Sequence, residues 1–207
     1  MKCMRSILIG VASVGLIFAL ATHVFASSTK TSDVTVSFIE DPTVHQLSLD
    51  AVPSIKFGEN VLSLKDEVYE STTIEPFVQV TDNRLNAVGW KVEVKASPFT
   101  STSEDIIEGA ELRFQNARVI PDSSYKDFAE PTPVTPVRLT TDEVATEVIS
   151  AEAGAGQGTW KTKWLPASYD PTTPPATNNN VILSVPGGSA NQGTYTSTLT
   201  WTLKDAP

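Results

Sequence analysis

The side chains that usually carry covalent or acid–base catalysis are scarce in this sequence. Downstream of residue 26, His45 is the only histidine and cysteine is absent. A serine-hydrolase arrangement would have to use His45, but no Gly-x-Ser-x-Gly segment accompanies it. One histidine is also too few for the usual zinc sites, which need three or four ligands. Two acids would suffice for glycoside cleavage, but the acids here fall mostly in loops or outward on strands. We therefore expect no enzyme activity, no metal and no cofactor.

The tryptophans offer a different chemistry, because sugars stack on open aromatic faces and indoles have large apolar surfaces. Trp160 and Trp164 share one side of an alternating stretch, and two lysines between them could meet carboxylates of a ligand. Loops border this pair, so we expect it to be more exposed than Trp90 and Trp201 and to be a second candidate contact surface. Trp90 and Trp201 lie on apolar strand faces, where core packing is the alternative interpretation.

Two alternating segments, 111 residues apart, position Trp90 and Trp201. Apolar residues alternate with threonines in residues 195–203, with Ser197 as the one exception, and with charged residues in residues 89–96. Side chains two positions apart share one face of a strand, so both segments are predicted to be half-buried strands. Each tryptophan is followed two positions later by an aliphatic residue, Val92 or Leu203. We expect the two strands to pair or to face each other.

The segment Asp82-Asn83-Arg84 lies just before the first of these strands. Asp and Asn side chains bond the nearby backbone, so one interpretation is a turn whose polar groups are satisfied. The other is that Asp82 holds Arg84 and presents it to a ligand.

The N-terminus has the order of a secretory signal. Lys2 and Arg5 precede an apolar run, and Val24-Phe25-Ala26 supplies small residues for cleavage. A membrane anchor is the alternative, but the apolar run is short for a span of about 20 residues and no basic segment follows it. We therefore predict a signal peptide over residues 1–26, a short tether over 27–43, a β domain over 44–207, and no membrane span after cleavage.

The charge of the chain is strongly acidic, with 24 acids against 15 bases. Loss of residues 1–26 would remove two of those bases and no acid. Nucleic acid is excluded as a partner, because phosphates require a basic surface. Docking by net charge on anionic lipid or phosphate polymers is excluded for the same reason.

The remaining pattern predicts an all-β fold, a single β-sandwich or Greek-key-like domain with long Pro-rich and Asn/Pro-rich loops. Short strands at regular spacing are expected, and no segment has a helical period. Besides the two tryptophan strands, they are expected at Val34–Phe38, Val44–Ala51, Ile55–Phe57, Phe77–Val80, Leu112–Phe114, Arg118–Ile120, Val137–Leu139, Val148–Ile149, Trp160–Trp164 and Val181–Val185. Loops are expected at 98–109, 121–136, 151–158 and 166–180.

Several short phrases carry a resemblance to a known family. They are Val80–Arg84, Trp90-Lys-Val92, Ala96–Thr100, Val185–Gly188 and the closing Leu199–Pro207, which contains Trp201-Thr-Leu203. With them, the chain from about residue 47 to residue 207 resembles the WxL-domain proteins of the Gram-positive cell surface. That domain carries one Trp-x-Leu motif in its middle and a second at its C-terminus. One position departs from the pattern, because Val92 stands where the motif has leucine.

The resemblance implies peptidoglycan binding through the two motifs, that is, through Trp90, Val92, Trp201 and Leu203. It also implies other WxL proteins and wall- or membrane-anchored surface proteins as partners. The leading hypothesis is a secreted, non-enzymatic protein held non-covalently on the wall, because no Leu-Pro-x-Thr-Gly signal or apolar tail ends the sequence. The alternative is a subunit of a surface complex that contacts the wall indirectly, and an enzyme is the third hypothesis.

Overall fold

The computed structural model describes residues 32–39, 46–121 and 128–205. The chain divides into two units, residues 1–38 and residues 39–207. The described part of the first unit carries no strand, so the prediction of a strand at Val34–Phe38 was wrong. An alternating pattern alone does not make a strand, because a strand also needs a neighbour for its backbone groups. The predicted signal peptide, His45 and most of the predicted tether lie outside the described residues.

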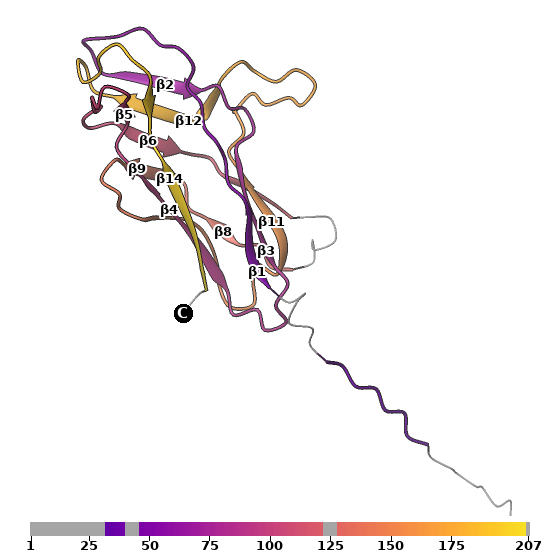
Figure 1. Cartoon of the computed structure of the whole chain (residues 1–207). Coiled ribbons are helices and arrows are strands. Elements are labelled where there is room, and N and C mark those ends of the chain that lie inside the picture. The colour runs from indigo at the N-terminus through magenta and orange to yellow at the C-terminus, as the bar shows by residue number, and fades with distance from the viewer. Residues whose placement is uncertain (1–31, 40–45, 122–127, 206–207) are drawn as a thin grey trace, which may run out of the picture. The chain divides into compact units, whose positions relative to one another are not determined.

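The second unit is built from antiparallel strands, as Figure 1 shows. One sheet has the order β1 (Leu47–Ala51), β3 (Phe77–Asp82), β11 (Gly158–Lys163), β7 (Arg118–Pro121). A second has the order β14 (Leu199–Asp205), β4 (Trp90–Ala96), β10 (Thr146–Ala151), β8 (Thr132–Pro133). A third has the order β2 (Glu67–Ser71), β12 (Asn178–Val185), β6 (Glu111–Phe114), β9 (Val137–Thr140), and β13 (Tyr195–Thr196) pairs with β5 (Thr100–Ser101). The predicted all-β fold class is confirmed.

The three larger sheets share one apolar core. Alternate residues of β3, β4, β6 and β11 are buried, as expected for strands with one face turned inward. Val80, Trp90 and Phe114 are among the buried residues, each from a different sheet. A smaller cluster formed by Phe99, Ile107 and their neighbours covers the end of the third sheet.

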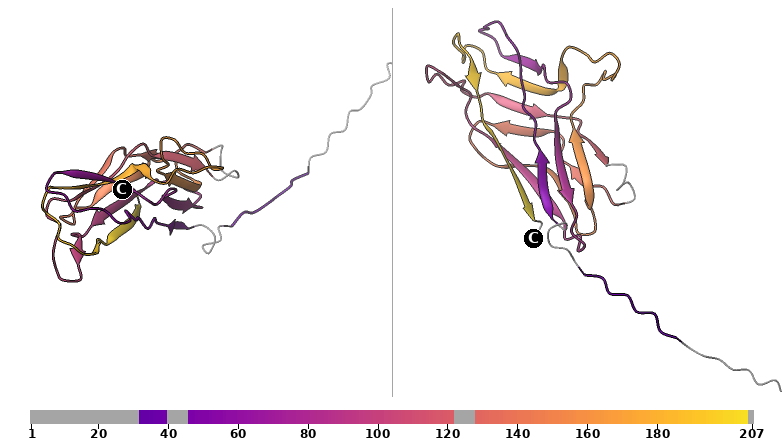
Figure 2. Two further views of the ribbon diagram at one scale, coloured as in Figure 1. Left: turned by 90° about the horizontal axis from the view of Figure 1, so that it is seen from above. Right: turned by 45° about the vertical axis from the view of Figure 1, so that its right-hand side comes forward.

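Strands β1 and β14 are the edge strands of two different sheets and lie beside each other. Figure 2 shows this in its right-hand view, with purple β1 next to yellow β14. β14 pairs along its whole length with β4, and no strand in the described part of the chain pairs with its other edge. The edges of the two sheets therefore lie side by side here, but β1 and β14 are not hydrogen-bonded to each other as strands. We call this the open boundary between β1 and β14.

Some element boundaries differ from the sequence-based prediction. Ile55 and Phe57 turn inward as the alternation indicates, but they belong to an extended segment without strand pairing. The expected loops at 98–109 and 121–136 contain the short strands β5 and β8. The expected loop at 166–180 ends earlier, because Asn178 begins β12. Residues 122–127 of the Pro-rich loop lie outside the described residues.

Candidate functional site

The two tryptophan motifs lie on neighbouring strands. β14 runs antiparallel to β4, with Leu203 opposite Val92 and Trp201 opposite Val94. Directly opposed residues of an antiparallel pair share one face, so both motifs point to the same side of the sheet. The expectation that the two strands pair is confirmed. The two indoles are not opposite each other, however, because Trp90 pairs with Asp205.

Trp90 and Val92 of the first motif belong entirely to the core, and neither has exposed surface. The indole Nε1 of Trp90 donates a hydrogen bond to the carbonyl oxygen of Gly156, at 3.1 Å. Gly156 has a positive φ of 74°, and a Cβ there would come within 2.7 Å of that Nε1 atom. The loop therefore closes over Trp90 only with glycine at this position.

Trp201 and Leu203 of the second motif are half-buried on the inner face of β14. The ring of Trp201 meets that of Phe114 edge to face, with 6.3 Å between centroids. Such a contact stabilises an aromatic pair beyond the area it buries. The rest of the Trp201 side chain faces a groove, so this motif differs from the first in having surface available to a ligand.

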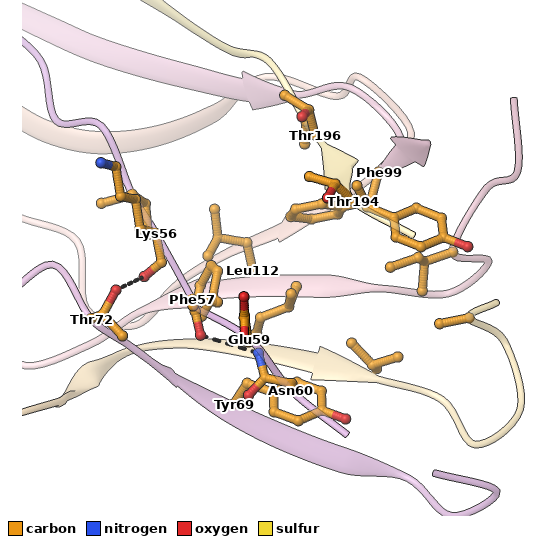
Figure 3. A pocket seen from close by; sticks show the side chains of 18 of the residues that line it. Lys56, Phe57, Glu59, Asn60, Tyr69, Thr72, Phe99, Leu112, Thr194 and Thr196 are labelled. Atoms are coloured by element: carbon orange, nitrogen blue, oxygen red, sulfur yellow. Dashed lines mark hydrogen bonds between the residues drawn. The ribbon is translucent and has the colours of Figure 1, made fainter. Parts of the chain in front are cut away.

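The groove has a volume of about 950 Å³ and runs between two segments far apart in the sequence. One wall is the extended segment Val52–Leu62, which follows β1. The other consists of residues 190–197 with Leu199 and Trp201. Figure 3 shows Phe57 and Tyr69 on one side and Phe99 and Thr194 on the other. Aromatic side chains from five places in the sequence line it, namely Phe57, Tyr69, Phe99, Tyr195 and Trp201.

Polar groups on the groove are mostly hydroxyls and amides. Its two charged lining residues are one base and one acid, Lys56 and Glu59. Some polar groups are already engaged, since the Asn60 amide donates to the Phe57 carbonyl at 3.1 Å, as drawn in Figure 3. The side chains of Thr194 and Thr196 form no hydrogen bond with other described residues and are exposed. A nearly neutral groove with aromatic walls and hydroxyl edges suits an uncharged, hydroxyl-rich ligand such as a sugar chain.

The segment Asp82-Asn83-Arg84 forms a closed polar cluster. Asp82 is fully buried and accepts two hydrogen bonds from the Arg84 guanidinium, at 2.8 and 2.9 Å. The same guanidinium donates to the Gly89 carbonyl at 2.9 Å and to the carboxylate of Asp205. The hydrogen bonds and charge of Asp82, followed by those of Asp205, raise the pKa of Arg84 above its ordinary value. Arg84 is thus held by groups of its own chain, which agrees with a satisfied turn.

The outer face of the motif strands carries a ladder of opposite charges. Glu93 of β4 lies between Lys91, at 3.1 Å, and Lys204 of β14. The hydrogen bond from Lys204 and then that from Lys91 lower the pKa of Glu93. This face presents balanced charge, and it contributes to the pairing of the strands.

The second tryptophan pair lies elsewhere, and our expectation of its exposure was wrong. Trp160 and Trp164 are 1% and 0% exposed. The Trp160 indole donates to the Gln157 carbonyl at 2.8 Å, and the Trp164 ring packs on Phe114 with 4.9 Å between centroids. Flanking lysines suggested an outward surface, but in a strand they occupy the opposite face from the indoles.

Sequence reasoning did not identify the groove. Its first wall, Val52–Leu62, showed only a short alternation around Ile55, and Tyr195 was assigned only to the inner face of a strand. The turn glycines did carry a signal. A Cβ at Gly187 would come within 2.4 Å of the Leu64 carbonyl oxygen, so this glycine marks a close approach of two loops.

Within the described residues there is no cluster of three metal-binding side chains and no helix suited to crossing a membrane.

A comparison with family models identifies the chain. The model of the WxL domain, described as surface cell wall-binding, matches residues 27–207. Neither a curated protein nor a solved structure matches the sequence. The family match covers the paired motif strands and both walls of the groove. The chain therefore belongs to the family of WxL surface, cell wall-binding domains.

Proposed function

We propose that the protein is exported and attaches non-covalently, without enzymatic activity, to the peptidoglycan of a Gram-positive wall. In this proposal the second motif and the groove contact the polymer, through Trp201 and the neighbouring aromatic residues. Leu203 supports Trp201 from the same face of β14. Trp90 and Val92 act indirectly, because they have no surface to offer and instead hold the strand to which β14 pairs.

The observation that carries the proposal is the placement of Trp201 on a nearly neutral, aromatic-lined groove. Aromatic faces stack on sugar rings, and hydroxyl and amide groups at the edges hydrogen-bond to sugar hydroxyls. The acidic chain gains little from attraction to a polyanionic wall. Stacking and hydrogen bonding therefore have to supply the affinity.

Sedimentation with purified wall tests the proposal. Residues 27–207 are mixed with wall stripped of its phosphate polymers, and the bound fraction is measured. Thr196→Tyr places a ring on the groove wall at an exposed position and is expected to reduce binding at least about tenfold. Thr200→Tyr makes the same change on the outward face of β14, outside the groove and away from Glu93, and is expected to leave binding unchanged.

A subunit of a surface complex is the second candidate, and the free edge of β14 favours it. An unpaired strand edge can accept a strand from another protein, with backbone hydrogen bonds supplying affinity. The same sedimentation experiment separates the candidates. If the pure chain stays in solution but sediments when surface extract is added, wall contact is indirect and direct attachment is contradicted.

A further inference from the structure

The cluster around Arg84 joins parts of the molecule that are distant in sequence. Asp82 ends β3, Gly89 immediately precedes β4, and Asp205 is the last residue of β14. The Arg84 guanidinium donates hydrogen bonds to all three. β3 belongs to one sheet, and β4 and β14 belong to another. Arg84 is therefore a clasp between two sheets at one end of the open boundary between β1 and β14.

The two halves of this clasp differ in strength. The Asp82 side chain is 0% exposed, so its charge would be costly without the paired guanidinium. Arg84 is thereby fixed in place by a buried partner. The Asp205 side chain is 72% exposed, and ion pairs of that kind contribute little to global stability. Loss of the Asp205 contact is thus expected to act locally, on the end of β14, and to leave the fold intact.

β14 is the strand for which a local restraint matters. It is an edge strand with backbone pairing on one side only, and it lies at the end of the described chain. Such segments open at free energies close to zero unless other contacts hold them. Trp201 lies four residues before Asp205, about 13 Å along an extended strand. A strand that frays from Asp205 would release the inner-face residues Leu203 and Trp201.

The clasp also restrains the position of one wall of the groove relative to the other. The wall Val52–Leu62 continues from β1, which pairs with β3, and Asp82 ends β3. The other wall includes Trp201 and is continuous with Asp205 along β14. A small cavity lined by Leu47, Arg84, Leu203 and Asp205 lies where the two edges approach at the clasp. The contacts of the Arg84 clasp thus restrain both walls of the groove from one end.

We propose that Arg84 and Asp205 are positioning residues that lock β14 against the neighbouring sheet and so hold Trp201 in the wall-binding groove. The expected effect on wall binding rests on the proposed function. The expected effect on how firmly β14 stays in its sheet does not depend on that function. Asp205 holds the second motif in place and does not itself contact the ligand.

The test compares two variants that each remove one exposed acid from an ion pair. Asp205→Ala breaks the contact with Arg84, and Glu143→Ala breaks the exposed pair with Lys95 of β4, 3.3 Å apart. Amide hydrogen exchange across residues 199–205 and wall sedimentation are measured on residues 27–207. For Asp205→Ala we expect exchange about two- to fivefold faster, binding weaker by about the same factor, and a melting temperature changed by no more than a few degrees.

The controls make each result decisive. Glu143→Ala is expected to match the wild type in exchange at 199–205 and in binding, and Asp205→Glu is expected to restore both because it keeps the carboxylate. Unchanged exchange in Asp205→Ala, or equal losses in Glu143→Ala, would overturn the clasp. If the wild type does not sediment, the proposed function fails, and the exchange measurement still decides the role of Asp205.

Discussion

The indole of Trp90 requires a glycine at position 156, far away in the sequence. Trp90 is fully buried, and its Nε1 donates to the carbonyl of Gly156, 66 positions downstream. The glycine can approach so closely because it has no Cβ, and its positive φ turns the loop over the indole. In the first WxL motif, the tryptophan therefore organises the core and a covering loop.

Two neighbouring glycines separate the steric requirement from the conformational one. Gly154 and Gly156 both have positive φ, but a Cβ at Gly154 meets nothing within 4 Å, whereas at Gly156 it would lie 2.4 Å from the Ala151 Cβ. Gly154→Ala is expected to lower the free energy of unfolding by about 1–2 kcal/mol, the cost of a left-handed alanine. Gly156→Ala should lose roughly a further 1–3 kcal/mol from overpacking. Denaturant titration measures both, and equal losses would contradict the contact with Trp90.

The strand pair β4–β14 is held by side chains on both of its faces. Inside, Val92 and Leu203 lie opposite each other, and outside, Glu93 bonds both Lys91 and Lys204. Because β14 has a free edge, these cross-strand contacts carry a large share of what keeps it in the sheet. Its attachment therefore depends on the charge of Glu93.

Acidification tests this dependence. Hydrogen bonds from Lys204 and Lys91 lower the pKa of Glu93 below its ordinary 4.5, so the folded state favours the charged form. The stabilisation is fully present above pH 4.5 and is lost as the pH falls through the lowered folded pKa. We expect β14 amides to exchange faster in Glu93→Gln than in the wild type at neutral pH. That difference should shrink toward zero in acid, and a difference independent of pH would contradict the assignment to Glu93.

Strands with strict alternation were predictable from the sequence, and the elements that shape the groove were not. β4 and β14 follow their patterns residue by residue, because burial of one face dictates the alternation. The start of β12 was mistaken for a loop because Asn178 and Asn180 are polar. Both are buried, and their amides donate to the carbonyls of Trp164 and Leu165, at 2.7 and 2.6 Å. Such partners become visible only when the chain is folded.

The candidate site was only partly predictable from the sequence, for a different reason. The sequence indicated that Trp90 and Trp201 belong together, which their strands do. It did not distinguish the buried indole from the one on a groove, because both segments alternate in the same way. The difference arises from position in the sheet, since β4 is hydrogen-bonded to a strand on each side, whereas β14, within the described residues, is hydrogen-bonded to β4 alone. Exposure of Trp201 is thus a consequence of topology.

At the scale of the whole domain, three sheets share a core, and the boundary between the edge strands β1 and β14 stays open. The groove opens along that boundary, between the segment after β1 and the segment before β14. Free edges usually invite aggregation, and natural proteins protect them. Here Lys204 and Asp205 place charges at the end of β14, which discourages pairing between copies at that end. The uncharged stretch around Trp201 remains the part open to a ligand.

The net charge of the molecule leads to a prediction about salt. The chain has 24 acids and 15 bases, and the groove is lined by only one charged residue of each sign. Attraction between the protein and a polyanionic wall therefore contributes little to binding, and repulsion between them is what salt would screen. Raising the salt concentration to about 0.5 M, where the Debye length is about 4–5 Å, should leave wall sedimentation unchanged within about twofold or strengthen it slightly. A basic, wall-binding control protein should dissociate under the same conditions. A strong loss of binding at moderate salt would show that ion pairs hold the domain on the wall, and a neutral groove could not then be the main contact.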